Sequence, residues 1–249
     1  MNESHPMRIL FNQLANIKPY PAGVVEIPEI LPGIAFFPGG TGLWKDSTIS
    51  EWPPVPEGGV MILGHNFGSK DYYDKCCRKW RGDWLKSPTW RNLLKLLNLT
   101  GIQLNQCLFT NAYMGLRNDG QETGPFPGAN DQRFKDECRT LFQIQVNIQK
   151  PRLILTLGQY IPDFISQTSD QLDRWEQYNG YFERLDSSPP GPIVDDVEFN
   201  MIPDFHTVLV ALVHPSFRVA NARNRVYNGK TGYDVEIDMV RDAMKLAKL

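Results

Sequence analysis

The sequence is poor in cysteine and contains no long hydrophobic run. Its 249 residues include only four cysteines, too few for a disulfide scaffold, so we expect reduced thiols and a cytoplasmic location. No apolar segment approaches the roughly 20 residues that a membrane-spanning helix needs, so no membrane partner is expected. Residues 1–9 are polar and lack the apolar centre of a secretory signal. These absences predict an ordinary globular protein.

The chain also has little net charge, −2, which argues weakly against nucleic acid as a partner. The charges are unevenly distributed, however. Residues 70–95 hold eight Lys or Arg against three acids, and residues 214–230 hold four and no acid. Residues 170–204 hold nine acids and two arginines. If the two basic segments meet in space, they form a patch suited to phosphates; otherwise they are separate solvated faces, the simpler interpretation on charge alone.

Short apolar segments of strand length alternate with segments whose apolar residues recur at helical spacing. Strands are expected at residues 60–63, 107–113, 153–157 and 207–213, and helices near 88–97, 131–149, 160–169 and 234–247. This pattern predicts an α/β fold, a three-layer α/β/α sandwich with a central four-stranded parallel sheet, in a single domain over residues 1–249. Residues 1–57 are expected to form an irregular arm rich in proline and glycine, and residues 170–206 an acidic surface insertion.

Polar residues follow the predicted strands at their carboxyl ends, where ligands bind in open α/β sheets. The segment Gly64-His65-Asn66-Phe67-Gly68 follows the first strand, and His214-Pro215-Ser216 follows the last. Asn111 lies in the second strand segment, and Gly158-Gln159-Tyr160 follows the third. Each segment by itself is compatible with a plain turn or with a histidine that closes a strand. The Gly-x-Gly-x-x-Gly and P-loop motifs of many nucleotide-binding folds are absent.

Taken together, these segments resemble the motifs of the uracil-DNA glycosylase superfamily. Residues 64–68 are similar to its first motif in the Gly-x-Asn-Pro-Gly form, and His214-Pro215-Ser216 is similar to its second motif. Asn111 matches the asparagine that reads the pyrimidine. The form His-Pro-Ser-x-Arg, which ends at Arg218, is similar to the single-strand-selective monofunctional branch. The matching order and spacing cover residues 58–225.

The resemblance implies a monofunctional DNA glycosylase that hydrolyses the N-glycosidic bond of a flipped-out uracil-like or 5-modified pyrimidine and leaves an abasic site. It implies catalytic roles for His214, which would donate a hydrogen bond to the departing base, and for Asn66, which would position the water. The base-binding residues that it implies are His65, Phe67, Gly68, Trp80 and Asn111. The DNA-binding residues that it implies are Ser216, Phe217, Arg218, Arg223 and Arg225, with Arg218 as the wedge that enters the duplex. DNA is the expected partner of a monomer without cofactor or metal; the four cysteines lack the spacing of an iron–sulfur site.

Departures from the family pattern keep other functions open. Some members carry a tyrosine at the position of Gly68 that blocks bases substituted at C5. Its absence favours a 5-modified pyrimidine, including a glucosylated hydroxymethylcytosine of phage DNA removed as antiviral defence, as an alternative to uracil repair. Asn66 is not a carboxylate and Phe67 replaces the usual proline, so a catalytically silent binder of flipped or single-stranded bases is a further alternative. The last alternative is an α/β nucleotide-binding protein that is unrelated to this family.

Overall fold

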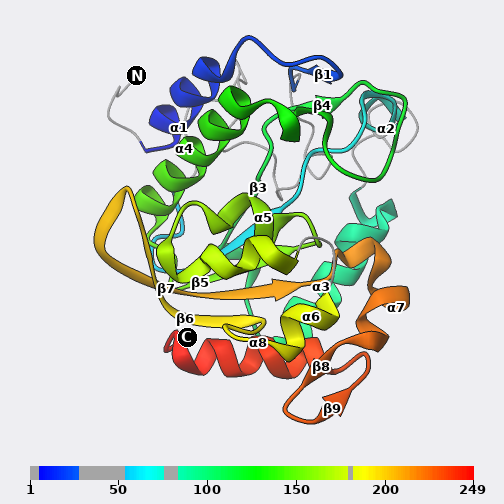
Figure 1. The fold of residues 1–249 in the computed structure, drawn as a ribbon, viewed down its shortest axis with the longest axis vertical. Helices are drawn as coiled ribbons and strands as arrows, with labels where there is room; N and C mark the ends of the chain where they lie inside the picture. The colour runs from blue at the N-terminus through cyan, green and yellow to red at the C-terminus, as the bar shows by residue number, and fades with distance from the viewer. Residues whose placement is uncertain (1–5, 28–53, 76–83, 179–181) are drawn as a thin grey trace.

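The computed structural model describes residues 6–27, 54–75, 84–178 and 182–249, and its centre is a five-stranded sheet (Figure 1). The strand order is β3 (Cys107–Asn111), β2 (Val60–Gly64), β5 (Leu153–Leu157), β7 (Ile202–Leu212) and β6 (Ile193–Phe199). The first four run parallel, and β6 pairs antiparallel with β7 at one edge. The predicted α/β class is confirmed, but the sheet has one strand more than the four predicted.

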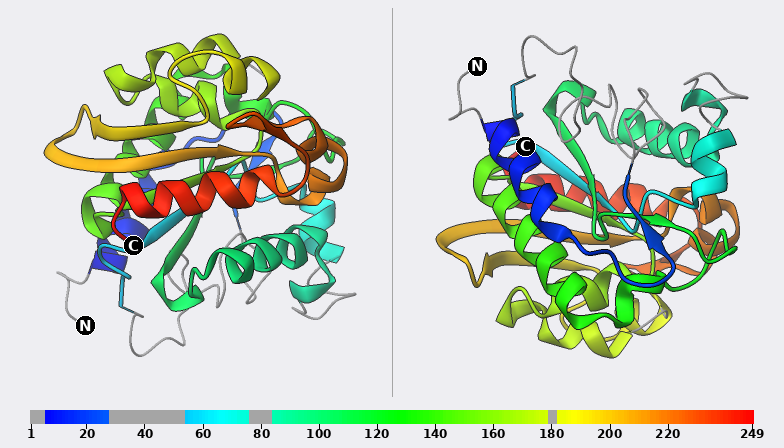
Figure 2. Two further views of the ribbon diagram at one scale, coloured as in Figure 1. Left: turned by 90° about the horizontal axis from the view of Figure 1, so that it is seen from below. Right: turned by 90° about the horizontal axis from the view of Figure 1, so that it is seen from above.

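Helices lie on both faces of this sheet (Figure 2). On one face, α3 (Pro88–Thr100) contacts α8 (Val235–Leu246), which also contacts β5, β6 and β7. On the other face, α4 (Gln132–Gln149) contacts α5 (Ile161–Ser166), which contacts β5. Among the described helices, none is both long and apolar enough to cross a membrane.

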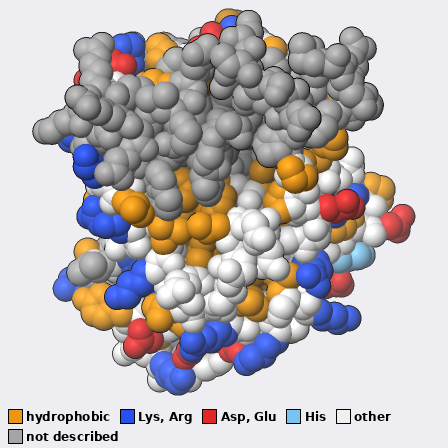
Figure 3. Space-filling view, turned by 180° about the vertical axis from the view of Figure 1, so that it is seen from behind, with side chains coloured by type: hydrophobic (Ala, Val, Ile, Leu, Met, Phe, Trp, Pro, Cys, Tyr) orange, Lys and Arg blue, Asp and Glu red, His pale blue; other side chains and the backbone are white. Residues whose placement is uncertain are grey.

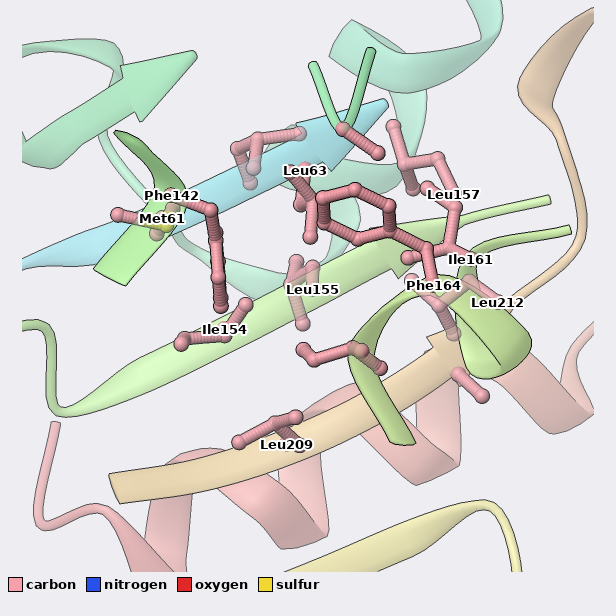
Figure 4. Close-up of a cluster of buried hydrophobic side chains, with 14 of the residues drawn as sticks. Met61, Leu63, Phe142, Ile154, Leu155, Leu157, Ile161, Phe164, Leu209 and Leu212 are labelled. Atoms are coloured by element: carbon pink, nitrogen blue, oxygen red, sulfur yellow. The ribbon is translucent and has the colours of Figure 1, made fainter. Parts of the chain in front are cut away.

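The core lies between the sheet and these helices because the parallel strands are apolar along their whole length. Leu63 of β2, Leu155 of β5 and Leu212 of β7 are fully buried. Phe142 of α4 and Phe164 of α5 pack among them (Figure 4). The strands are therefore held in register from both faces, and their carboxyl ends form one rigid edge.

Two regions are more regular than the sequence indicated. Residues 1–57 were expected to form an irregular arm, yet α1 (Pro6–Leu14) is a helix that contacts α4. The short strand β1 (Val24–Val25), which pairs with β4 (Leu116–Arg117), agrees with an arm that packs on the domain. Residues 170–206 contain β6, the start of β7, the 3-10 helix η6 (Asp170–Tyr178) and α6 (Phe182–Ser187). The acids of this region are compatible with a strand because β6 lies at the sheet edge, where one side faces water.

The start of α4 generates a stability prediction. Asp131 is its N-cap, and its Oδ1 accepts a hydrogen bond from the N–H of Phe134 at 2.8 Å. We expect Asp131→Ala to lower the free energy of unfolding by about 1 kcal/mol, because the N–H of Phe134 loses this partner. Urea denaturation at pH 7 measures the change. Asp131→Asn is the matched control, since asparagine caps a helix equally well; equal losses in both variants would contradict the capping role.

Candidate functional site

The main pocket of the described structure lies at the carboxyl ends of the parallel strands and has a volume of about 680 Å³. Residues 64–69 after β2, Asn111 at the end of β3, residues 158–160 after β5 and His214 after β7 all line it. The register of the sheet makes this possible, because Gly64 pairs with Asn111 and Leu157 pairs with Leu212. The strand ends that the sequence singled out therefore converge on one cavity.

The orientation and charge of His214 follow from its hydrogen bonds. The N–H of Ser216 donates to Nδ1 of His214 at 3.3 Å, and Oγ of Ser216 lies 2.7 Å from the same nitrogen. A backbone N–H can only donate, so Nδ1 is an acceptor and the neutral ring carries its proton on Nε2. Burial lowers the pKa of His214 to about 4, so the ring is neutral at physiological pH. His214 therefore offers the pocket one fixed N–H donor.

Asn66 is fixed in the same manner. Its Oδ1 accepts a hydrogen bond from the N–H of Gly68 at 2.7 Å, which identifies the oxygen end of the amide. Its Nδ2 lies 2.9 Å from Nδ1 of His65, so Nδ1 of His65 accepts and the proton of that neutral ring is on Nε2. Burial first, then the charge that His214 gains when it is protonated below pH 4, and then the charge of Arg117 lower the pKa of His65 to about 3.

Two residues that line this pocket, His65 and Asn111, carry buried side-chain donors without partners among the described residues. Nδ2 of Asn111 and Nε2 of His65 are both inaccessible to solvent, and neither has a hydrogen-bond partner in the described part of the chain. Asn111 is itself 1% exposed, at the end of β3. Because an unsatisfied buried donor costs roughly 1–3 kcal/mol, a ligand that supplied acceptors to these two groups would relieve that cost.

Aromatic rings form part of the pocket wall. The ring of His65 stacks on Tyr160, with centroids 4.9 Å apart and an angle of 29° between the planes. Phe67 is 5% exposed, and Phe182 of α6 reaches the pocket from the acidic region. The sequence pointed to Tyr160 only by its place after β5 and gave no signal for Phe182. Trp80, the ring predicted to stack on the base, lies outside the described residues.

A loop after β4 forms another wall that the sequence analysis missed. Arg117, 3% exposed, makes a bidentate ion pair with Asp119 and donates to the carbonyl oxygens of Thr123 and Gly124. Thr123, Gly124 and Glu122 all line the pocket. Arg117 therefore holds this loop beside the site, and its burial and its partners within the next seven residues distinguish it from a surface arginine.

Gly68 lines the pocket. Its backbone geometry does not fit the prediction that this glycine stands where a tyrosine wall is missing. Its backbone φ is +84°, the left-handed region in which a side chain is strained. A Cβ at this position would lie 3.2 Å from Cδ1 of Tyr72. Tyr72 itself lines the pocket, and its hydroxyl lies 3.3 Å from Oγ of Ser87. Gly68 thus serves the turn that fixes Asn66, and the wall beside it is Tyr72.

The structure corrects the assignment of two arginines to DNA. Arg225 is 1% exposed, and its guanidinium pairs with Asp186 and Glu236 in the interior. Such a side chain cannot reach a phosphate. Arg218 has a 13% exposed side chain, lies 3.6 Å from Glu236 and donates to the carbonyl of Tyr233. Both guanidinium groups are directed to internal partners, so Arg218 is not a free wedge.

The other predicted DNA-binding residues have suitable positions. Phe217 is 47% exposed and lines the pocket, as does Ser216, and Arg223 is exposed. Phe217 is the last residue of the 3-10 turn η7 (Pro215–Phe217), and the carbonyl of Pro215 accepts a hydrogen bond from Asn92 of α3 at 2.7 Å. Phe217 therefore presents an exposed aromatic ring on a fixed turn at the pocket rim.

The same hydrogen bond shows that the two basic segments meet, since Asn92 belongs to residues 70–95 and Pro215 to residues 214–230. Their cations do not all remain available for phosphates. Lys70 pairs with Asp74, and Arg91 donates to two carbonyl oxygens of residues 85 and 86. On the face in Figure 3, Lys and Arg side chains are interspersed with uncharged and acidic groups.

Comparisons with known proteins do not place the chain in a family: no protein-family model matches it, and no curated protein shows significant similarity. Within the described ranges, no three His, Cys, Asp or Glu side chains lie close enough together to hold a metal ion. The functional assignment therefore depends on the geometry of the pocket.

The two pocket histidines generate a prediction on pH. Their pKa values in the folded protein, about 3 for His65 and about 4 for His214, lie below the ordinary 6.5, so protonation favours the unfolded chain. This stability is fully present above pH 6.5 and is lost as the pH falls toward 4 and 3. At pH 5 the loss is roughly 2 kcal/mol for each histidine, from about 1.4 kcal/mol per pKa unit.

Urea denaturation at pH 7 and pH 5 measures this loss. We expect the double variant His65→Gln/His214→Gln to lose less stability than the wild type between these pH values. His206, with a 46% exposed side chain, supplies the matched control His206→Gln. A double variant with the same pH dependence as the wild type would show that neither histidine is neutral because of burial.

Proposed function

We propose that the protein is a monofunctional DNA glycosylase that hydrolyses the N-glycosidic bond of a flipped-out pyrimidine, uracil-like or modified at C5, and leaves an abasic site. The observation that carries this proposal is the neutral His214, whose Nε2–H is fixed by Ser216 in a pocket that Asn66 and Asn111 also line. The layered α/β/α arrangement, with the pocket at the carboxyl ends of parallel strands, is compatible with the resemblance seen in the sequence.

The chemistry needs two contributions. As the bond from the sugar carbon to the base nitrogen breaks, its electron pair leaves with the base, and positive charge develops on the sugar. The Nε2–H of His214 stabilises the negative charge on a base oxygen, as donors of an oxyanion hole do. Asn66 cannot take up a proton as a strong base, so it positions the water that adds to the sugar carbon, and the water's proton passes to the solution or the base.

The unpartnered donors favour a pyrimidine as the base. Asn111 Nδ2 and His65 Nε2 have no acceptor in the described structure, and both residues line the pocket with His214. Pyrimidine bases carry a carbonyl oxygen at C2, and uracil carries a second one at C4. A flipped base would therefore satisfy buried donors that otherwise cost stability.

A second candidate is the excision of a bulky modified cytosine, such as a glucosylated hydroxymethylcytosine of phage DNA. The observation that favours it is the pocket volume of about 680 Å³, which lies well within the range of about 300–1,000 Å³ for drug-sized ligands. A single pyrimidine ring needs less space. Tyr72, Phe182 and the loop of Glu122 are among the walls of this pocket.

Incubation with labelled oligonucleotides tests both candidates. The substrates carry uracil, 5-hydroxymethylcytosine or its glucosylated form, in single-stranded and duplex DNA, and alkali cleaves the strand wherever a base has been released. Cleavage of any of them supports a glycosylase and identifies the base. Tight binding without cleavage would instead support a catalytically silent binder of flipped bases.

His214→Ala should lower the single-turnover rate of base release by about 10²- to 10³-fold, because the departing base loses its hydrogen-bond donor. DNA affinity should change little, since most of it comes from phosphate contacts. His206→Ala, on the exposed start of β7, is the control. A single-turnover rate equal to that of the wild type would remove His214 from the mechanism.

Phe217→Ala should slow base release from duplex DNA by at least about tenfold relative to single-stranded DNA. Flipping a base out of a duplex costs a few kcal/mol of unstacking and unpairing, which an inserted ring offsets, and a single strand carries less of this cost. Tyr233→Ala is the matched control, because Tyr233 is also an exposed aromatic residue but is not among the residues that line the pocket. Equal losses on both substrates would assign Phe217 to base binding.

A further inference from the structure

A cluster of buried charges lies directly behind the pocket. Its members are Arg218, Arg225, Asp186 and Glu236, and the side chains of Arg225, Asp186 and Glu236 are at most 1% exposed. Arg225 donates to both oxygens of Asp186 at 2.8–3.1 Å and to Oε1 of Glu236 at 2.8 Å. Two arginines balance two carboxylates, which is the condition for burying such groups. We call these four residues the Arg225 cluster.

Glu236 connects this cluster to the strand that carries His214. Its Oε1 accepts a hydrogen bond from the N–H of Val213 at 2.7 Å. Val213 lies after the last residue of β7 and directly before His214, at a point where the sheet no longer supplies a partner for this N–H. The Glu236 carboxylate of α8 therefore supplies the acceptor for this N–H at the point where the hydrogen bonds of the sheet end.

The cluster also reaches the pocket wall on its other side. The guanidinium carbon of Arg225 lies 4.5 Å above the ring centre of Phe182, which lines the pocket. Arg225 further donates to the carbonyl of Ala211 in β7 at 2.9 Å. One buried network thus holds both the end of β7 and the ring of α6 that faces the same cavity.

Glu236 acts on His214 through geometry. The lowered pKa of His214 is explained by burial alone, with no contribution from a neighbouring charge. The carboxylate of Glu236 is paired with Arg218 and Arg225, so its charge does not act on the imidazole. What Glu236 supplies is a fixed position for the backbone that leads into the His214–Ser216 turn.

We propose that Glu236 is a positioning residue for His214: by accepting the N–H of Val213, it fixes the end of β7 so that the Nε2–H of His214 points into the pocket. Its role in catalysis rests on the proposed glycosylase function, whereas its effect on the imidazole does not. The charge of Glu236 stabilises the fold through its ion pair with Arg225. Its hydrogen bond to the N–H of Val213 positions His214. These two roles can be separated by substitution.

Glu236→Gln and Glu236→Leu separate them. Glutamine keeps a carbonyl oxygen that can accept the N–H of Val213 but loses the charge, and leucine loses both. Each variant leaves Arg225 and Arg218 with one carboxylate fewer, so each should melt at a lower temperature than the wild type. Asp238→Asn is the matched control, since Asp238 lies on the same helix but pairs with the exposed Lys230.

The decisive readout is the imidazole itself, measured by ¹⁵N NMR on the full chain at pH 7, below the melting temperature of every variant. We expect one tautomer of His214, with the proton on Nε2, in the wild type, in Glu236→Gln and in the control. Glu236→Leu should show both tautomers. A single Nε2–H tautomer in Glu236→Leu, or a mixture in Glu236→Gln as well, would overturn the positioning role.

Single-turnover base release supplies the second readout. Glu236→Leu should slow the chemical step by roughly 10- to 100-fold with unchanged DNA affinity, because a small displacement of a reacting group has effects of this size. Glu236→Gln should retain the rate within a few-fold despite its lower melting temperature. Rates that fall alike in both variants, in step with stability, would show that Glu236 is only structural. If the wild type releases no base, the proposed function fails, and the imidazole spectra still decide the role of Glu236.

Discussion

The backbone N–H groups of Gly68 and Ser216 each donate to a side chain two residues earlier, to Oδ1 of Asn66 and Nδ1 of His214. These two contacts determine which atoms the side chains present to the pocket. Because an N–H can only donate, the amide oxygen of Asn66 and the proton on Nε2 of His214 are both fixed by the fold. The left-handed φ of Gly68 is part of this arrangement, since it turns the chain directly after the N–H that Asn66 binds.

Burial determines the charge of the two pocket histidines. The pocket keeps His214 and His65 neutral, so each ring offers one N–H donor and not a full positive charge. A neutral donor is sufficient to stabilise negative charge that develops on a departing base, and it binds an uncharged base without the cost of a buried cation. The same burial leaves Nδ2 of Asn111 without an acceptor among the described residues. A ligand with carbonyl oxygens would supply the acceptor that this group lacks among the described residues.

Much of this site could be predicted from the sequence because parallel strands end at one edge of the sheet. Asn66, Asn111 and His214 lie at three strand ends, and apolar strands of this kind are recognised by composition alone. The strand β6 could not be predicted in this way. Asp195 and Asp196 are exposed side by side in it, and Asp196 has a left-handed φ of +56° where the pairing with β7 shifts, which breaks the simple alternation.

The arginines show the limit of sequence motifs most clearly. Arg218, Arg223 and Arg225 are indistinguishable as a basic run, yet Arg223 is exposed while Arg225 is buried. What decides their roles is Asp186, 39 residues before Arg225 and within the segment expected to be a surface insertion. Asp186 and Glu236 pair with Arg225 in the interior, whereas Phe217 and Arg223 remain exposed. The acidic segment, residues 170–206, therefore helps to shape the pocket: its Asp186 pairs with Arg225, and its Phe182 lines the cavity. The charge of Asp186 is the reason why Arg225 has a structural role.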